Sequence, residues 1–141
     1  MRGAVLFLVL AATLGACASS SSGPEPARLE RVATSGAGMF TAAWTVVGAD
    51  AIPENEPFEL DVRLYHDAER TRPLTGAELI VSAWMPDHGH GMNRRPEATE
   101  VEPGRYRVRG MLLHMGGFWQ LFLDVIAGGV SERAQFELEL P

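Results

Sequence analysis

The sequence predicts an all-β domain, an immunoglobulin-like antiparallel β-sandwich of about seven strands. Hydrophobic residues alternate with smaller or polar ones in short runs from Met39 to the end of the chain, and this is the period of half-buried strands. Turn residues separate these runs regularly, and no long stretch after Cys17 has helical periodicity. A small antiparallel barrel is the alternative fold for the same pattern.

The expected strands can be read off in order. They cover residues 40–46, 58–64, 77–84, 98–101, 106–115, 118–126 and 133–140. The strictest alternation is in 58–64, where hydrophobic residues occupy every second position. Glu102-Pro103-Gly104-Arg105 matches a type II turn, with proline at the second position and glycine at the third.

The N-terminus is typical of a bacterial lipoprotein precursor. Arg2 precedes an apolar run at residues 4–14, which is too short to span a membrane and fits a secretory signal peptide over residues 1–16. The next residues, Leu14-Gly15-Ala16-Cys17, resemble the lipobox of bacterial lipoproteins, whose cysteine is acylated and becomes the mature N-terminus. An ordinary signal peptide with an incidental cysteine and a short anchor helix are the alternatives.

The remainder of the chain divides into a linker and one domain. Residues 17–38 are expected to be the lipidated N-terminus and a flexible Ser/Gly/Pro-rich linker, and residues 39–141 the β-sandwich domain. We therefore expect the domain to be tethered to a membrane and to face the periplasm or the exterior. Ala18 is not the Asp of an inner-membrane retention signal, which favours the outer membrane.

Charge excludes one class of function. Without Arg2, eleven basic residues face eighteen acidic ones, a net charge of −7 with histidine neutral. A basic surface for nucleic acid is therefore not expected, nor is attraction to anionic headgroups. The lipid on Cys17 must hold the protein at the membrane.

Histidine and methionine concentrate in two segments. The first runs from Trp84 to Met92 (WMPDHGHGM) and the second from His114 to Trp119 (HMGGFW). Three of the four histidines lie here. The candidate ligands are His88, His90, Met92, His114 and Met115.

Imidazole and thioether together favour copper, because thioether is a soft ligand for Cu(I) and imidazole binds both Cu(I) and Cu(II). Zinc is less suited, since methionine is a poor zinc ligand and cysteines are missing. Two interpretations stay open: a copper site, or a loop held by packing and hydrogen bonds with methionines filling the core. His66, beside Asp67 at a strand end, is expected to be structural.

These segments also carry a resemblance. WMPDHGHGM and EPGRYRVRGMLLHMGGFW, with the strand that follows, resemble the YtkA-like domain family over residues 40–140. The family consists of small exported bacterial domains, often lipid-anchored, so the resemblance implies an immunoglobulin-like sandwich. Its relatives in copper handling and cytochrome oxidase assembly imply copper for the five candidate ligands. Gly116-Gly117 departs from the Pro-Gly pair usual in the family.

Two functions follow from these observations. The first is a lipid-anchored protein that binds copper or delivers it to an acceptor in the envelope. The second is a non-metal interaction module whose partner is another envelope protein. No motif for nucleophilic catalysis, phosphate binding or paired acid–base carboxylates has supporting context, so we do not expect an enzyme.

The lipobox makes a direct prediction about processing. Cys17→Ser should abolish lipid attachment and leave uncleaved precursor or a soluble form. Detergent partitioning and intact mass of the wild-type and variant proteins measure both effects. A wild-type Cys17 that carries no lipid would contradict the prediction.

Overall fold

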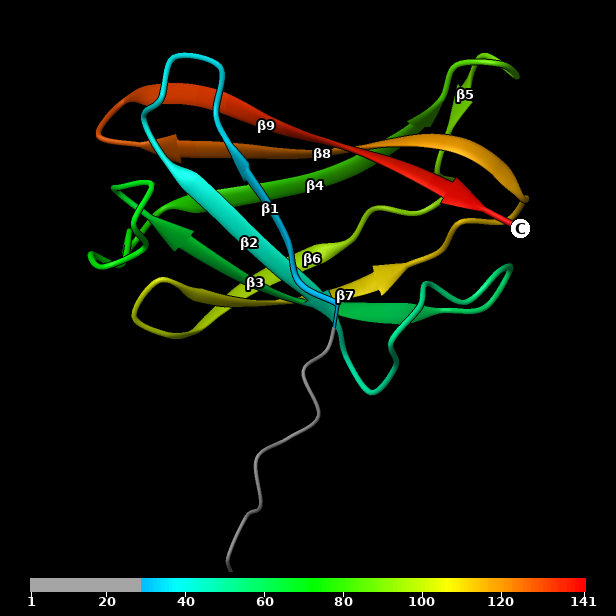
Figure 1. Cartoon of the computed structure of the whole chain (residues 1–141), viewed down its shortest axis with the longest axis horizontal. Helices are drawn as coiled ribbons and strands as arrows, with labels where there is room; N and C mark the ends of the chain where they lie inside the picture. Colours follow the sequence, from blue (N-terminus) through cyan, green and yellow to red (C-terminus); the bar gives the residue numbers. More distant parts are fainter. Residues whose placement is uncertain (1–28) are drawn as a thin grey trace, which may run out of the picture.

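The computed structural model describes residues 29–141, which form two antiparallel sheets packed face to face (Figure 1). The expected signal peptide, the lipobox and the first part of the linker lie outside the described residues. No helix in the described range is long and apolar enough to cross a membrane.

Nine strands make up the two sheets. The five-stranded sheet has the order β1-β2-β3-β7-β6, and the four-stranded sheet has the order β5-β4-β8-β9. Their bounds are β1 Arg31–Thr34, β2 Thr41–Val46, β3 Phe58–Tyr65, β4 Glu78–Met85, β5 His90–Gly91, β6 Glu97–Glu102, β7 Arg105–Met111, β8 Gly117–Ala127 and β9 Val130–Leu140. The predicted all-β sandwich is confirmed, with nine strands where about seven were expected.

The two additional strands are short edge strands. β1 pairs with β2 from Arg31↔Trp44 to Thr34↔Thr41, so part of the segment expected to be linker belongs to the sandwich. Its sequence signal is weak because it has only four residues and its Val32 is exposed. β5 has two residues, too few for any alternation to be recognised.

The core lies between the sheets and is built from alternate residues of both. Trp44 on β2 meets Phe136 on β9 edge to face, with ring centroids 5.7 Å apart, which is a favoured geometry for aromatic pairs. The largest fully buried side chains include Trp44, Trp119 and Phe40. Because Cys17 is the only cysteine, this packing stabilises the fold without an internal disulfide.

β7 ends at Met111, so the prediction of one strand over 106–115 was wrong in its second half. Gly110 has a φ of +84°, and the chain then leaves the five-stranded sheet to begin β8 in the other. Residues 112–116 are therefore a crossing segment between the sheets. Leu113 is fully buried within it, which explains why the segment looked like a continuing strand.

Tyr106 joins the two sheets by hydrogen bonds at the end of the sandwich opposite the crossing segment. Its hydroxyl donates to the carbonyl of Ala77 and accepts from the amide of Ala77, both at 3.1 Å. Tyr106 lies on β7, whereas Ala77 directly precedes β4 of the other sheet. Burial raises the pKa of Tyr106, which keeps the hydroxyl protonated and able to donate.

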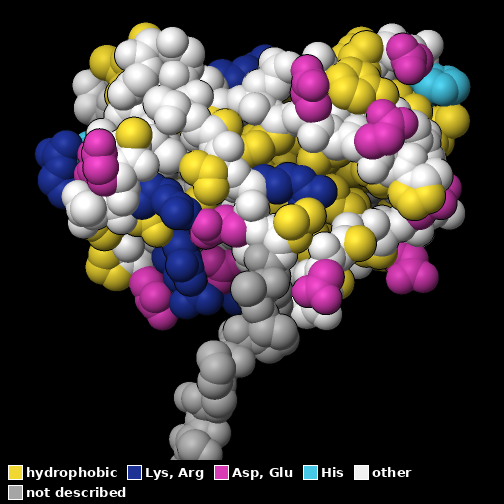
Figure 2. Space-filling model, viewed as in Figure 1, with side chains coloured by type: hydrophobic (Ala, Val, Ile, Leu, Met, Phe, Trp, Pro, Cys, Tyr) yellow, Lys and Arg dark blue, Asp and Glu magenta, His cyan; other side chains and the backbone are white. Residues whose placement is uncertain are grey.

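The outer face of the five-stranded sheet is covered by ion pairs. Arg105 binds Asp61 through two nitrogens, with Nε 2.9 Å and Nη2 2.6 Å from Oδ2. Arg107 and Arg109 approach Glu59 at 3.6 and 3.5 Å. Figure 2 shows such basic and acidic side chains side by side at its lower left. These carboxylates are engaged with arginine, as expected for a polar strand face.

The Tyr106 bridge predicts the effect of a single-atom change. Tyr106→Phe should lower the free energy of unfolding by about 1–3 kcal/mol, because both backbone groups of Ala77 lose their partner. Urea unfolding of residues 29–141 measures the loss. Tyr65→Phe is the matched control, since the Tyr65 hydroxyl makes no hydrogen bond within the described residues, and it should change stability by no more than about 0.5 kcal/mol. Equal losses in the two variants would contradict the bridge.

Candidate functional site

The first of the two histidine segments forms a tight hairpin between β4 and β5. The amide of Gly89 donates to the carbonyl of Met85 at 2.9 Å, and Gly89 has a φ of +68°, which an L side chain rarely adopts. His90 then pairs with Met85. Directly paired residues share a sheet face, and Met85 is buried, so the His90 side chain lies on the inner face of the hairpin.

The second histidine segment is the crossing segment between β7 and β8. Leu113 anchors it in the core, and the carbonyl of Leu113 accepts from the amide of Asn55 at 2.8 Å. His114 follows Leu113 and is half-buried. The hairpin and the crossing segment both lie at the right-hand end of the sandwich in Figure 1.

Glycine is required where the crossing segment enters β8. A Cβ on Gly116 would lie 2.1 Å from the carbonyl oxygen of Pro141, and a Cβ on Gly117 would lie 2.9 Å from the terminal methyl of Met85. Gly117 also has a φ of +106°. Two backbone segments and the Met85 side chain meet at the Gly-Gly pair. Only residues without a Cβ therefore allow this close packing.

The three histidines of the two segments form a row of rings. His90 and His114 are stacked with ring centroids 5.0 Å apart and planes inclined by 29°. His88 follows at 5.9 Å from His90, and its side chain is exposed in the hairpin turn. His88 thus does not lie on one extended face with His90 and Met92, as the sequence suggested, because the turn of residues 86–89 intervenes.

Trp119 forms the inner wall of this row. It is fully buried, and its ring meets His114 at 5.6 Å and His90 at 5.9 Å, in both cases edge to face. Its indole Nε1 donates to the carbonyl of Met115 at 3.0 Å, which holds the crossing segment against β8. The alternation of Trp119 with Leu121 and Leu123 predicted its burial, but no sequence signal placed it beside the histidines.

One buried atom of this site lacks a partner. His114 Nδ1 is inaccessible to solvent and makes no hydrogen bond among the described residues. Buried polar atoms are nearly always satisfied, so an exception at a cluster of potential ligands needs an explanation. The indole nitrogen of Trp44 is also unpaired, but it is a donor only and lies in the core.

The methionines lie around the histidines at differing depth. Met92 and Met115 are partly buried and pack against the core, and the amide of Met92 bonds to the carbonyl of Ala83 at 3.2 Å. Met85 is buried and reaches Gly117, beside the crossing segment. The sequence placed Met92 and Met115 among the candidate ligands, and the structure brings both to the end of the sandwich that holds His90 and His114.

The fourth histidine is separate from this cluster. His66 follows β3 in the connection that enters β4 at the end far from the hairpin. Its neighbour Asp67 accepts from the amide of Thr71 at 2.9 Å, and this bond holds the pKa of the Asp67 carboxyl below its usual value. The structural role expected of His66 stays a prediction.

The side chains present in the cluster limit which ligands a metal ion could have there. In the part of the chain that the structure describes, no three His, Cys, Asp or Glu side chains are grouped so that they could hold a metal ion. A metal at this end would therefore have to use two imidazoles and a ligand of another kind. Thioether sulfur is the other soft donor close by.

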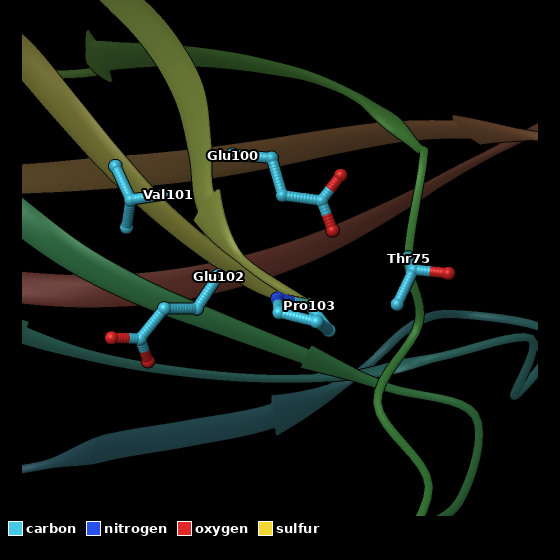
Figure 3. Close-up of a pocket in the computed structure, with 5 residues that line it drawn as sticks. All are labelled: Thr75, Glu100, Val101, Glu102 and Pro103. Carbon is cyan, nitrogen blue, oxygen red and sulfur yellow. The ribbon is translucent and has the colours of Figure 1, made fainter.

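A surface hollow lies elsewhere and is explained by the fold. It is lined by Thr75, Glu100, Val101, Glu102 and Pro103 (Figure 3). The carboxylate of Glu100 accepts from the amides of Gly76 at 2.9 Å and Gly104 at 2.8 Å. Its acidic group thus joins the β6–β7 turn to the segment before β4, and we do not regard the hollow as a functional site.

Fold and site together define a small two-sheet β-sandwich with a histidine-rich end. The family model described as YtkA-like matches residues 42–124, and the chain belongs to this family. A solved structure of a DUF4426 family protein from Pseudomonas aeruginosa PAO1 is similar, with a TM-score of 0.54 and 14% identity, over 79% of this chain and 94% of that one. At this identity the likeness concerns the fold alone. Comparison with the curated proteins gives no match.

Gly117 allows a test of how tightly the site is built. Gly117→Ala should lower the free energy of unfolding by roughly 1–3 kcal/mol, because the new methyl meets Met85 in a conformation that alanine rarely adopts. Chemical unfolding measures the change. Gly129→Ala is the control, since Gly129 has a φ of +80° but open space around it. If both variants lose the same stability, contact with Met85 does not constrain this position.

Proposed function

We propose that the protein is a lipid-anchored envelope protein that binds copper at the histidine end of its sandwich. The observation that carries the proposal is the meeting of His90 and His114, from segments far apart in sequence, with an unpartnered Nδ1 on His114. When the proton is on Nε2, Nδ1 carries a lone pair that faces no donor, and a rotation of the buried ring would present this lone pair to a metal ion.

The spacing of the two rings fits a shared ion. With metal–nitrogen bonds of about 2 Å, two imidazoles bound at a roughly tetrahedral angle have ring centroids about 5 Å apart. The observed separation of His90 and His114 is 5.0 Å. The ring planes are inclined by only 29°, so at least one ring would have to turn for both in-plane lone pairs to point at one ion, and Trp119 limits such movement on the inner side.

Thioethers decide which metal is favoured. Met92 and Met115 follow the two histidines closely in sequence, and a set of two imidazoles with one thioether suits Cu(I) better than zinc. His88 is the remaining imidazole. Its ring is exposed, with its centroid 5.9 Å from that of His90, and it is not grouped with His90 and His114 as a third ligand.

The expected location fits this activity. A lipid on Cys17 would tether the domain through the segment that precedes β1, and the negative net charge favours anchoring by lipid over anchoring by charge. Free thiols form disulfides in an oxidising compartment, where imidazole and thioether remain free to bind copper. Binding or delivery of copper to an envelope acceptor requires no catalytic residue, and we propose no enzymatic role.

An interaction module without metal is the alternative, and one observation favours it. Trp84 and Ile80 on β4 keep 41% and 46% of their surface exposed on the outer face of the sandwich. Such side chains are frequent at protein–protein contacts. This surface is on the other side of the sheet from His90, so the two functions are compatible.

Copper binding is tested by titration of the soluble domain. Residues 29–141 should bind one Cu(I) ion more tightly than Zn²⁺, and binding should change the fluorescence of the adjacent Trp119. His90→Gln combined with His114→Gln should weaken Cu(I) binding by roughly 100-fold or more. Affinity should fall as the pH is lowered, because protons compete with the metal ion for the imidazole nitrogens.

The control is His66→Gln, which should leave copper affinity unchanged. Circular dichroism and the melting temperature of the metal-free double variant show whether its fold is intact. A folded double variant that binds Cu(I) as tightly as the parent would refute the copper site and leave the interaction module.

A further inference from the structure

The outward side of β4 and β8 carries an apolar surface. Its members are the outward-facing hydrophobic residues of these two central strands, namely Ile80, Trp84, Phe118, Phe122 and Ile126, which we call the outer apolar face. The register places Phe122 opposite Ser82 and Ile126 opposite Glu78, so the apolar residues alternate with polar ones across the two strands. Trp84 and Ile80 protrude most, with 41% and 46% of their surface exposed.

Other exposed hydrophobic residues do not form such a group. Leu29, Val32, Val101 and Val130 lie before β1, on the edge strands β1 and β6, and at the start of β9. The outer face of the five-stranded sheet is covered by arginine–carboxylate pairs. The two faces of one small sandwich thus differ in character. Scattered exposed valines are ordinary, but Ile80 and Trp84 are exposed on one face of the same strand, diagonal to the half-buried Phe122, and such a grouping indicates a contact surface.

The rim of the outer apolar face is acidic. Glu78, Glu137 and Glu139 lie on it, and none forms an ion pair within the described residues. Arg133 also lies there, but Asp124 neutralises it through two bonds of 2.7 and 2.9 Å, and its guanidinium rests 4.3 Å above the Phe122 ring. The unpaired charges that β4 and β9 contribute to the rim are therefore negative, whereas the exposed Arg94 and Arg95 follow the edge strand β5.

Charge selects among the possible occupants. A second copy related by a two-fold axis would bring a rim of the same negative sign against this one, without basic residues to match the unpaired Glu78, Glu137 and Glu139. Anionic lipid headgroups would be repelled in the same way. We propose that the outer apolar face docks a different protein, whose contact surface has an apolar centre and a basic rim.

The docking surface is continuous with the hairpin that carries His90. Trp84 pairs with Gly91, where an added Cβ would lie 3.7 Å from the indole ring and 3.0 Å from the carbonyl oxygen of Ala83. Glycine at 91 thus leaves the indole uncovered at this edge. A partner seated on Trp84 would contact the hairpin from the outside while His90 faces inward. The proposal rests on this surface and stands without copper.

The test uses site-specific photocrosslinking of the full chain in its native cells. Benzoylphenylalanine at position 80 or 84 should give one adduct with another protein. The same probe at Val32 or Val101, which are equally exposed at 48% but lie elsewhere, should not give it. Glu78→Arg with Glu137→Arg should reduce the adduct roughly tenfold or more, because the rim is then basic. Glu97→Arg on β6 is the matched control and should leave the adduct unchanged.

Mass spectrometry of the adduct identifies the contacted peptide of the partner, which should carry basic residues. An Arg→Glu change in that peptide should restore crosslinking to the charge-reversed variant. Sedimentation of residues 29–141 and flotation with phosphatidylglycerol vesicles test the other occupants. An adduct of twice the chain's mass, a lipid adduct, an adduct insensitive to charge reversal, or no adduct at positions 80 and 84 would each overturn the proposal.

Discussion

The packing of Trp119 is the contact on which the arrangement of the histidine end depends. Its ring is fully buried at the start of β8, and its nitrogen holds the carbonyl of Met115. Because the crossing segment between the sheets is tied to this residue, His114 is held beside the ring that also supports His90. A bulky side chain that completes the core therefore also sets the spacing of the two imidazoles.

The fold was largely predictable from the sequence, because hydrophobic and polar residues alternate along most of its half-buried strands. Leu60, Val62 and Leu64 repeat every second position, and these residues are buried in the structure. The strands that the sequence did not predict are too short for an alternating pattern to be recognised. β5 has two residues, and β1 has four with an exposed valine. The crossing segment was assigned to a strand because buried Leu113 continues the hydrophobic run beyond Met111.

The site was only partly predictable, for a different reason. Clustering of histidine and methionine in two segments is visible in the sequence, but their meeting depends on which strands pair across the sandwich. The pairing of β4 with both β5 and β8 brings His90 and Trp119 together, and no local pattern encodes that order. Likewise the exposure of His88 follows from a turn at Gly89, whose backbone conformation had to be seen.

The β4–β5 hairpin combines two surfaces with opposite chemistry. Its inner side holds His90 against a fully buried tryptophan and beside His114, whose Nδ1 has no hydrogen-bond partner within the described residues. Its outer side exposes Trp84 within an acidic rim. The β4–β5 hairpin is a single layer of strands. A protein bound on its outer side would therefore lie close to an ion bound at the proposed site on its inner side. In the copper site that we propose, this geometry would let a partner approach the ion without passing through the core, and it would suit transfer of the ion better than its storage.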